Sequence, residues 1–296
     1  MTCAPDSTTS SPLISRLQLL AAALLFSTGG AAIKATELSS WQVACFRSAA
    51  AAVTVLLLVP AARRNWCWRV PLVGAAYAAT MVTFVTANKL TTSANAIFLQ
   101  DTAPLYLLLA GPLLLREPLR RSDMWLTLTL GAGMALFFVG EQQPLATAPR
   151  PLAGNLVALA SGVTWAATLG GLRWIQGHSH GRDAGMATVV AGNVMACVFC
   201  LPHALPVENA GAKDWLVVSY LGVFQIGLAY AFLTRAMRRI PALEASLLLL
   251  AEPALNPIWA WVIHSERPLN PALLGGGLIL GGTTAAMFRG SGRQQR

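Results

Sequence analysis

Charged residues are scarce in this sequence. Asp, Glu, Lys and Arg make up only 11% of its 296 residues, whereas about 25% is usual in soluble domains. Hydrophobic residues account for 55%, and the mean hydropathy is +0.57. This composition excludes an ordinary soluble domain and indicates that the lipid bilayer is the solvent of most of the chain.

Several motifs of catalytic proteins are also missing. The chain contains no G-x-x-x-x-G-K-[ST] segment, which argues against an ATP-driven pump, and no H-E-x-x-H or G-x-S-x-G motif, which argues against an intramembrane enzyme. The five cysteines include a C-x-x-C at Cys197 and Cys200, but this pair lies in an apolar stretch without a second Cys or His pair. We therefore expect no catalytic residues, no metal and no cofactor.

Long apolar stretches dominate the sequence instead. A membrane-spanning helix needs roughly 20 mostly apolar residues. Segments of this kind, separated by charged residues, Pro or Gly, lie at 14–33, 40–60, 70–88, 93–115, 123–140, 153–174, 184–204, 215–235, 243–263 and 271–288. The predicted fold class is therefore all-α integral membrane, with ten transmembrane helices.

The net charge of +9 is distributed unevenly between the loops. If the N-terminus is inside, the inner loops and tails carry fifteen Lys and Arg residues, and the outer loops carry only Lys34, Lys89, Arg150, Lys213 and Arg267. Positive charge is enriched in cytoplasmic loops, so we expect both termini in the cytoplasm. Because this charge follows the loops, and no basic helix is interleaved with aromatic residues, nucleic acid is not an expected partner.

The second half of the chain repeats the first. Two segments align, ANAIFLQDTAPLYLLLAGPLLLREPL and LEASLLLLAEPALNPIWAWVIHSERPL, and Pro104 falls on Pro253. LAAALLF, which ends at Phe26, likewise resembles LASGVTW, which ends at Trp165. The predicted organisation is a cytoplasmic tail at 1–13, a first five-helix repeat at 14–140, an outside linker at 141–152, a second five-helix repeat at 153–289 and a cytoplasmic tail at 290–296.

Each predicted repeat has five helices, an odd number, so the second repeat enters the membrane in the opposite orientation to the first. Inverted repeats are common in transporters, where two similar halves expose a central site to either side of the membrane in turn. We therefore expect two inverted five-helix repeats around a central cavity. The alternative is a duplication that serves stability alone.

One stretch carries a family signature. The sequence YLGVFQIGLAYAFLTRAMRRIPALEASLLLLAEPALNPIWAWVIHSERPL, which begins at Tyr220, resembles the second-half signature of the EamA family in the drug/metabolite transporter superfamily. NKLTTSANAIFLQDTAPLYLLLAGPLLLREPL repeats it in weaker form, and Arg47 stands where this family often has an arginine in the second helix. The resemblance implies a central cavity and export of amino acids, other metabolites or toxic compounds, and the bacterial exporters of aromatic and neutral amino acids look nearest. Asp101 departs from the pattern, because an apolar or neutral residue is usual at that position.

Ionisable residues inside the spans are the first candidates for a substrate site. Each costs about 2.5–3.5 kcal/mol to insert and requires a partner or a water-filled cavity. Arg47, Asp101 and Glu252 are three such residues. Arg47 would receive a substrate carboxylate, whereas Glu252 or Asp101 would receive an ammonium group or titrate with a coupled proton. The alternative is an Arg47–Asp101 ion pair that joins two helices.

Aromatic and polar residues at helical spacing form the second group of candidates. Such residues share one face of the third predicted helix, and the repeat makes Phe26 equivalent to Trp165, so these two rings are expected to face each other. Helix packing alone is the competing interpretation of the same pattern. The predicted substrate-binding residues are Phe26, Arg47, Tyr77, Met81, Phe84, Asn88, Phe98, Asp101, Trp165, Tyr230, Glu252 and Asn256.

Prolines interrupt the fourth and ninth predicted helices. Pro104, Pro253 and Pro257 remove backbone donors midway along these segments. We predict that they are paired hinges for alternating access, with static kinks as the alternative.

These patterns favour a secondary transporter that exports small metabolites, above all aromatic and neutral amino acids, by alternating access across the bacterial inner membrane. The expected partners are a small-molecule substrate, the lipid bilayer and protons as the candidate coupling ion. The alternatives are other cargo, such as drugs, cations or nucleotide sugars, and, less favoured, an intramembrane enzyme or a receptor that does not transport. Nucleotide sugars would require more cationic side chains in the cavity than Arg47.

Overall fold

The structure is a computed structural model and describes residues 12–114, 121–139, 144–178, 184–208, 210–237, 248–249 and 251–294. The first half contains α1 (Pro12–Ser27), α2 (Gly29–Lys34), α3 (Ser40–Leu58), the 3₁₀ turn η1 (Pro60–Arg63), α4 (Arg69–Leu90), α5 (Ser93–Gln100), α6 (Ala103–Leu114) and α7 (Arg121–Leu136). The second half contains α8 (Pro151–His178), α9 (Gly185–Ala204), α10 (Ala212–Tyr220), the π-helix η2 (Leu221–Leu228), α11 (Ala229–Met237), α13 (Ala251–His264) and α14 (Asn270–Gln294).

Six helical stretches in the described ranges are long and apolar enough to cross a membrane. They are Leu13–Lys34, Ser40–Leu58, Arg69–Leu90, Pro151–Leu172, Gly185–Ala204 and Ala212–Ala236. The first combines α1 with α2, and the last combines α10, η2 and α11. The predicted segments 93–115, 123–140 and 271–288 fall on α5 and α6, on α7 and on α14. The prediction at 243–263 begins outside the described residues, and its later part falls on α13. Helix α14 continues to Gln294, which corrects the predicted helix end at 288 and the tail predicted at 290–296.

The segment predicted as one helix at 93–115 is divided into α5 and α6, which corrects the sequence prediction. Helix α5 ends at Gln100, and α6 begins at Ala103. Pro104 therefore lies in the first turn of α6, where its missing N–H costs no helical hydrogen bond, whereas in the middle of a continuous helix its ring would clash with the preceding turn. The break leaves Asp101 and Thr102 between the two helices.

Short polar side chains cap the starts of these apolar helices and form hydrogen bonds to the backbone within them. Helix α3 begins with a capping box in which Ser39 Oγ accepts from the N–H of Gln42 (3.2 Å) and Gln42 Oε1 accepts from the N–H of Ser39 (3.0 Å). Thr92 Oγ1 caps α5 by accepting from the N–H of Asn95 (3.3 Å). Within the spans, Thr54 and Thr188 donate to the carbonyl four residues earlier, so their hydroxyls need no other partner in an apolar environment.

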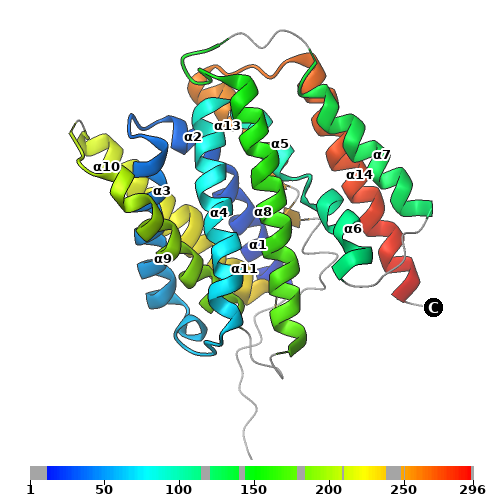
Figure 1. Cartoon of the computed structure of the whole chain (residues 1–296), viewed down its shortest axis with the longest axis horizontal. Coiled ribbons are helices and arrows are strands. Elements are labelled where there is room, and N and C mark those ends of the chain that lie inside the picture. Colours follow the sequence, from blue (N-terminus) through cyan, green and yellow to red (C-terminus); the bar gives the residue numbers. More distant parts are fainter. Residues whose placement is uncertain are drawn as a thin grey trace, which may run out of the picture.

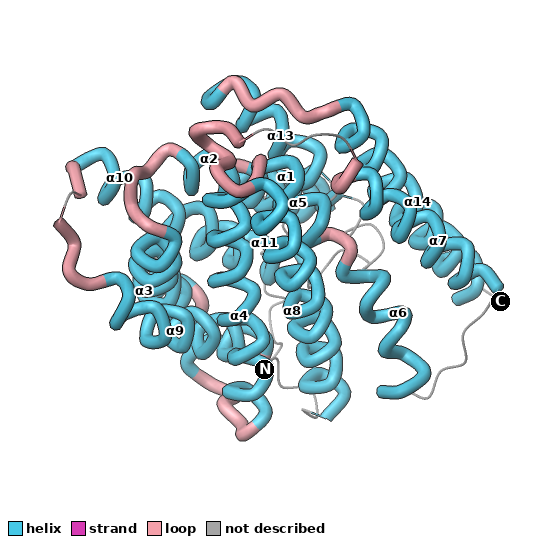
Figure 2. Tube along the Cα trace, turned by 45° about the horizontal axis from the view of Figure 1, so that its top comes forward, coloured by secondary structure: helices cyan, strands magenta, loops and turns pink. Residues whose placement is uncertain are grey.

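The two halves of the chain pack mainly against each other. Helix α4 lies along α8 and α9, α3 lies along α9 and η2, α1 lies along α11 and α13, and α5 lies along α8 and α13. Helices α7 and α14 form a separate pair at the side of the bundle, beyond α6 (Figures 1 and 2). Helices at corresponding places in the two halves therefore make corresponding contacts, as α1 with α13 and α8 with α6.

The two ends of the bundle differ in what they contain. At the end drawn uppermost in Figure 1, α2 ends, α8 begins and the N–H of Arg150 donates to the carbonyl of Leu90 (3.1 Å). We name this the Lys34 end. The opposite end contains η1, the end of α8 and the start of α9, and we name it the η1 end. Helices α1 and α2 thus run towards the Lys34 end, whereas α8 runs away from it.

Candidate functional site

A cavity of about 590 Å³ lies between helices of both halves. Its volume is within the range of about 300–1,000 Å³ that is typical of small-molecule sites. Nine of the residues predicted to bind substrate line it: Phe26, Arg47, Tyr77, Met81, Phe84, Asp101, Trp165, Tyr230 and Glu252. Towards the η1 end its wall continues through Leu172 of α8 and Gly185 of α9.

Two carboxyl groups face this cavity from different halves. Asp101 follows α5 directly, and Glu252 lies in the first turn of α13. Within the described part of the chain, neither carboxyl lies within 4.0 Å of a Lys or Arg nitrogen, and neither has a hydrogen-bonding side chain as partner. The Arg47–Asp101 ion pair, considered from the sequence, is therefore not formed, and both carboxyls are available to a ligand.

Arg47 supplies the cationic side of the cavity wall. It is only 1% exposed. A terminal nitrogen of its guanidinium donates to the carbonyl of Met81 (3.3 Å) and to Met81 Sδ (3.4 Å). Its Nε has no hydrogen-bonding partner in the part of the chain that the structure describes. A buried guanidinium with an unused donor is costly for the protein alone, so this geometry favours an anionic or carbonyl group of a ligand.

Aromatic rings form the apolar part of the wall. The ring centroids of Phe26 and Tyr230 are 5.2 Å apart, and those of Tyr77 and Tyr230 are 6.2 Å apart, both in edge-to-face geometry. Asn193 Nδ2 donates to the hydroxyl of Tyr77 (3.3 Å) and holds this ring in place. Trp165 of α8 lines the same cavity as Phe26. Such edge-to-face clusters accommodate a planar or branched apolar group.

Three of the predicted residues lie outside the cavity lining. Phe98 packs on Phe137, with ring centroids 5.9 Å apart. Ser93 Oγ contacts Asn256 Oδ1 at 2.6 Å and Asn88 Oδ1 at 3.2 Å, which joins these residues in a buried polar cluster at the Lys34 end. Periodicity placed Asn88 and Asn256 on the correct helix faces but one or two turns too far along for the cavity.

A buried ion pair closes the Lys34 end between the halves. Lys34 Nζ lies 3.0 Å from Glu266 Oε1, and the two side chains are 2% and 3% exposed. Lys34 Nζ also donates to the carbonyls of Thr91 (2.7 Å) and Thr147, and the N–H of Ser93 donates to Glu266 Oε2 (3.0 Å). The cationic partner of Glu266 is thus Lys34, 232 residues away in the sequence, rather than the adjacent Arg267.

Sequence reasoning missed part of the wall. Helix α9 contributes Met186, Thr188 and Val189, and α11 contributes Leu233 and Thr234. Met186 and Val189 are three residues apart, and Leu233 and Thr234 follow Tyr230 by three and four residues, which is the spacing that marks one helix face. The same spacing is typical of helix packing, so only the neighbouring helices distinguish a cavity wall from a packing face.

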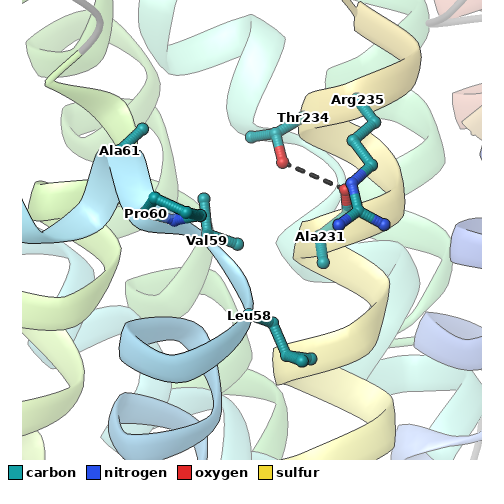
Figure 3. Close-up of a pocket in the computed structure, with 7 residues that line it drawn as sticks. All are labelled: Leu58, Val59, Pro60, Ala61, Ala231, Thr234 and Arg235. Atoms are coloured by element: carbon teal, nitrogen blue, oxygen red, sulfur yellow. Dashed lines mark hydrogen bonds between the residues drawn. The ribbon is translucent and has the colours of Figure 1, made fainter. Parts of the chain in front are cut away.

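A smaller hollow of about 220 Å³ lies beside the cavity at the η1 end. It is formed between Leu58, Val59, Pro60 and Ala61 on one side and Ala231, Thr234 and Arg235 of α11 on the other (Figure 3). Thr234 lines both this hollow and the cavity, and its hydroxyl donates to the carbonyl of Ala231 (3.2 Å).

The predicted hinge prolines lie near the cavity carboxyls. Pro104 is three residues after Asp101, and Pro253 follows Glu252 directly in the first turn of α13. Pro257 is inside α13, where it removes a backbone hydrogen bond. In the described ranges, no group of three or more His, Cys, Asp or Glu residues is placed to hold a metal ion.

Comparisons with known proteins agree with this architecture. A solved structure described only as "Crystal structure of protein" is similar over 95% of this chain and 98% of that chain, with a TM-score of 0.60 and 21% sequence identity, and at that identity the similarity concerns the fold. No curated protein sequence matches the chain. The model of the EamA-like transporter family matches twice, at residues 13–139 and 152–288, and confirms the resemblance to this family seen in the sequence. Because these two matches cover most of the chain, it belongs to the EamA-like transporter family and is a membrane transporter rather than an enzyme.

Proposed function

We propose that this protein exports amino acids, preferentially aromatic and neutral ones, by alternating access across the bacterial inner membrane. The observation that carries the proposal is one cavity that combines Arg47, a cluster of aromatic rings and two carboxyls that have no cationic partner among the described residues. An α-amino acid has a carboxylate for Arg47, an ammonium group for Asp101 or Glu252, and a side chain for the rings.

The arrangement of the halves supports alternating access. Helix α8, which is equivalent to α1 and α2 in the sequence repeat, runs in the opposite direction to them, and the contacts of one half recur in the other. With ten spans and both termini in the cytoplasm, the Lys34 end is the outer end. The buried Lys34–Glu266 pair then closes the outer side, and the cavity wall that extends towards the η1 end belongs to an inward-facing state.

Protons are the coupling ion that this site favours. Asp101 and Glu252 lie in the same cavity without a cationic partner in the described part of the chain. A charged carboxyl in a membrane cavity requires a positive ligand, so either the ammonium group of the cargo or a proton stabilises the pair. The hinge role of Pro104, Pro253 and Pro257 belongs to the same proposal, because these prolines adjoin the residues that would bind cargo.

Uptake of radiolabelled amino acids by proteoliposomes tests the function. We expect saturable uptake of phenylalanine and leucine, stimulated by a pH gradient. Glu252→Gln and Trp165→Ala are expected to lower uptake at least tenfold, because each removes a group that lines the cavity. Absence of uptake above that of empty liposomes, for aromatic, neutral and charged amino acids with and without a pH gradient, would contradict the amino-acid proposal.

Organic cations are the second candidate cargo. The observation in their favour is that two carboxyls line the cavity, whereas Arg47 is the one Lys or Arg among its described lining residues. The same liposomes distinguish the two classes: uptake of phenethylamine without uptake of phenylalanine favours cations, and the reverse favours amino acids.

A further inference from the structure

The π-helix η2 lies directly against the part of α3 that carries Arg47. Hydrogen bonds in a π-helix connect residues five apart, so residues at this spacing lie on one face. Gly222 and Gly227 are such a pair: a Cβ atom at Gly222 would lie 2.6 Å from the carbonyl oxygen of Arg47, and one at Gly227 would lie 2.4 Å from Thr54 Cγ2. Both glycines therefore permit close contact with α3. The residues between the two glycines lie on other faces of the π-helix.

Gln225 and Ile226 are the residues of η2 that line the cavity, and Gln225 is the polar one. Gln225 is 6% exposed and lines the cavity wall, and its Oε1 has no hydrogen-bonding partner within the described ranges. The amide of Gln225 packs against Gly29, where a Cβ atom would lie only 2.8 Å from Gln225 Nε2. The amide is thus held in a narrow space with one polar atom unsatisfied, an arrangement that costs stability unless a ligand completes it.

Gln225 and Arg47 together leave a complementary pair of polar groups unused. Among the residues that the structure describes, Arg47 Nε is a donor without a partner, and Gln225 Oε1 is an acceptor without a partner. Both side chains line the same cavity, on elements that pack directly against each other. A ligand that presents an acceptor next to a donor, as the head group of an α-amino acid does, satisfies both.

We propose that Gln225 is a specificity-determining residue that accepts a hydrogen bond from the ammonium group of an amino acid whose carboxylate contacts Arg47. This inference rests on the proposed function and extends it from a cargo class to a head-group requirement. A hydrogen bond to a charged group is stronger than a neutral one. Its loss is therefore expected to weaken binding about tenfold or more.

Binding of labelled L-phenylalanine to the purified full-length protein in detergent tests the proposal, with 3-phenylpropionate as the competitor. This competitor keeps the ring and the carboxylate but lacks the ammonium group. The test variant is Gln225→Met, which preserves side-chain length and removes the amide. We expect the dissociation constant for phenylalanine to rise at least tenfold, while the inhibition constant of 3-phenylpropionate changes less than threefold.

A second variant changes Gly29, the residue against which the amide of Gln225 packs. Gly29→Ala places a methyl group against the amide and should reproduce the selective loss for phenylalanine. Gly281→Ala is the matched control, because a Cβ atom there meets no atom within 4 Å, and it should bind both compounds as the unmodified protein does. If Gln225→Met does not fold, judged from its melting temperature, Gly29→Ala carries the test.

The outcomes separate the inference from the proposed function. If the unmodified protein binds phenylalanine and Gln225→Met weakens both compounds equally, or neither, the head-group assignment is overturned and the amino-acid proposal stands. If the unmodified protein binds no phenylalanine and no other amino acid, the proposed function and this inference both fail.

Discussion

At the scale of single residues, the most constrained interaction is the ion pair between Lys34 and Glu266. Both side chains are almost fully buried, and each has additional backbone partners, Thr91 and Thr147 for the ammonium group and Ser93 for the carboxylate. Buried charges depend strongly on their partners, because a charge left alone in an apolar interior cannot recover its hydration. This pair therefore joins the two halves at one end.

Removing one partner of this pair is predicted to destabilise the protein. Lys34→Met leaves the Glu266 carboxylate buried without a cation, so we expect a loss of about 3–5 kcal/mol and a clearly lower melting temperature in detergent. The double variant Lys34→Met/Glu266→Gln should recover part of the loss, because no isolated charge remains. Equal melting temperatures of the single variant and the unmodified protein would show that the pair contributes nothing to stability.

At the scale of elements, the break between α5 and α6 decides where Asp101 lies. Because α5 ends at Gln100 and α6 begins with Ala103 and Pro104, Asp101 belongs to neither helix and its side chain faces the cavity. The π-helix η2 acts similarly on the other side of the cavity, since its wider turns place two glycines against α3 and Gln225 on the wall. Irregular backbone occurs here where it borders a cavity, which is where a membrane protein tolerates it.

Pro104→Ala tests whether the break is used during transport. In this variant the N–H of residue 104 can donate to the carbonyl of Gln100, so one continuous helix can form from α5 to α6. Proline disfavours that continuous helix by about 3 kcal/mol. We expect the turnover of proteoliposome uptake to fall by roughly an order of magnitude, with little change in phenylalanine affinity. Pro71→Ala, in the first turn of α4 and exposed, is the control and should leave turnover unchanged. Normal turnover of Pro104→Ala would identify the proline as a static kink.

At the scale of the whole molecule, the two halves enclose the cavity between them, and one end is joined by the Lys34–Glu266 pair. Alternating access requires this end to separate in every cycle. None of the described residues that line the cavity belongs to the peripheral pair α7 and α14. A covalent link is therefore expected to stop transport at the Lys34 end and to leave it unaffected between α7 and α14.

Disulfide cross-linking of Lys34→Cys with Glu266→Cys is predicted to stop uptake by proteoliposomes, and reduction should restore it. The five native cysteines must be replaced first, because the sulfur atoms of Cys45 and Cys197 are 3.7 Å apart. Thr129→Cys with Gly282→Cys is the control on α7 and α14, where a Cβ atom at Gly282 would lie 3.1 Å from Thr129 Cγ2. Its cross-link should leave uptake intact. Continued uptake with the Lys34 end cross-linked would disprove gating there.

Properties that depend on local composition could be predicted from the chain alone. The membrane location follows from apolar runs that are long enough to span a bilayer, and family membership follows from motifs around Arg47 and the paired prolines. Arg47, Asp101 and Glu252 were recognisable because ionisable residues are rare in such runs and are costly there. Their scarcity is a signal that needs no knowledge of neighbouring helices.

Other features depend on which distant segments meet, and periodicity carries no such information. Asn88 follows Phe84 by one helical turn on the same face of α4. It nevertheless belongs to the cluster around Ser93, whereas Phe84 lines the cavity. Glu266 pairs with a lysine from the opposite half rather than with its neighbour Arg267. The role inferred for Gln225 became visible only through the missing partner of its amide and the proximity of Gly29. Lipid solubility and helix length are properties of each segment by itself, but a binding site is made where segments from two halves converge, so its members emerge from packing.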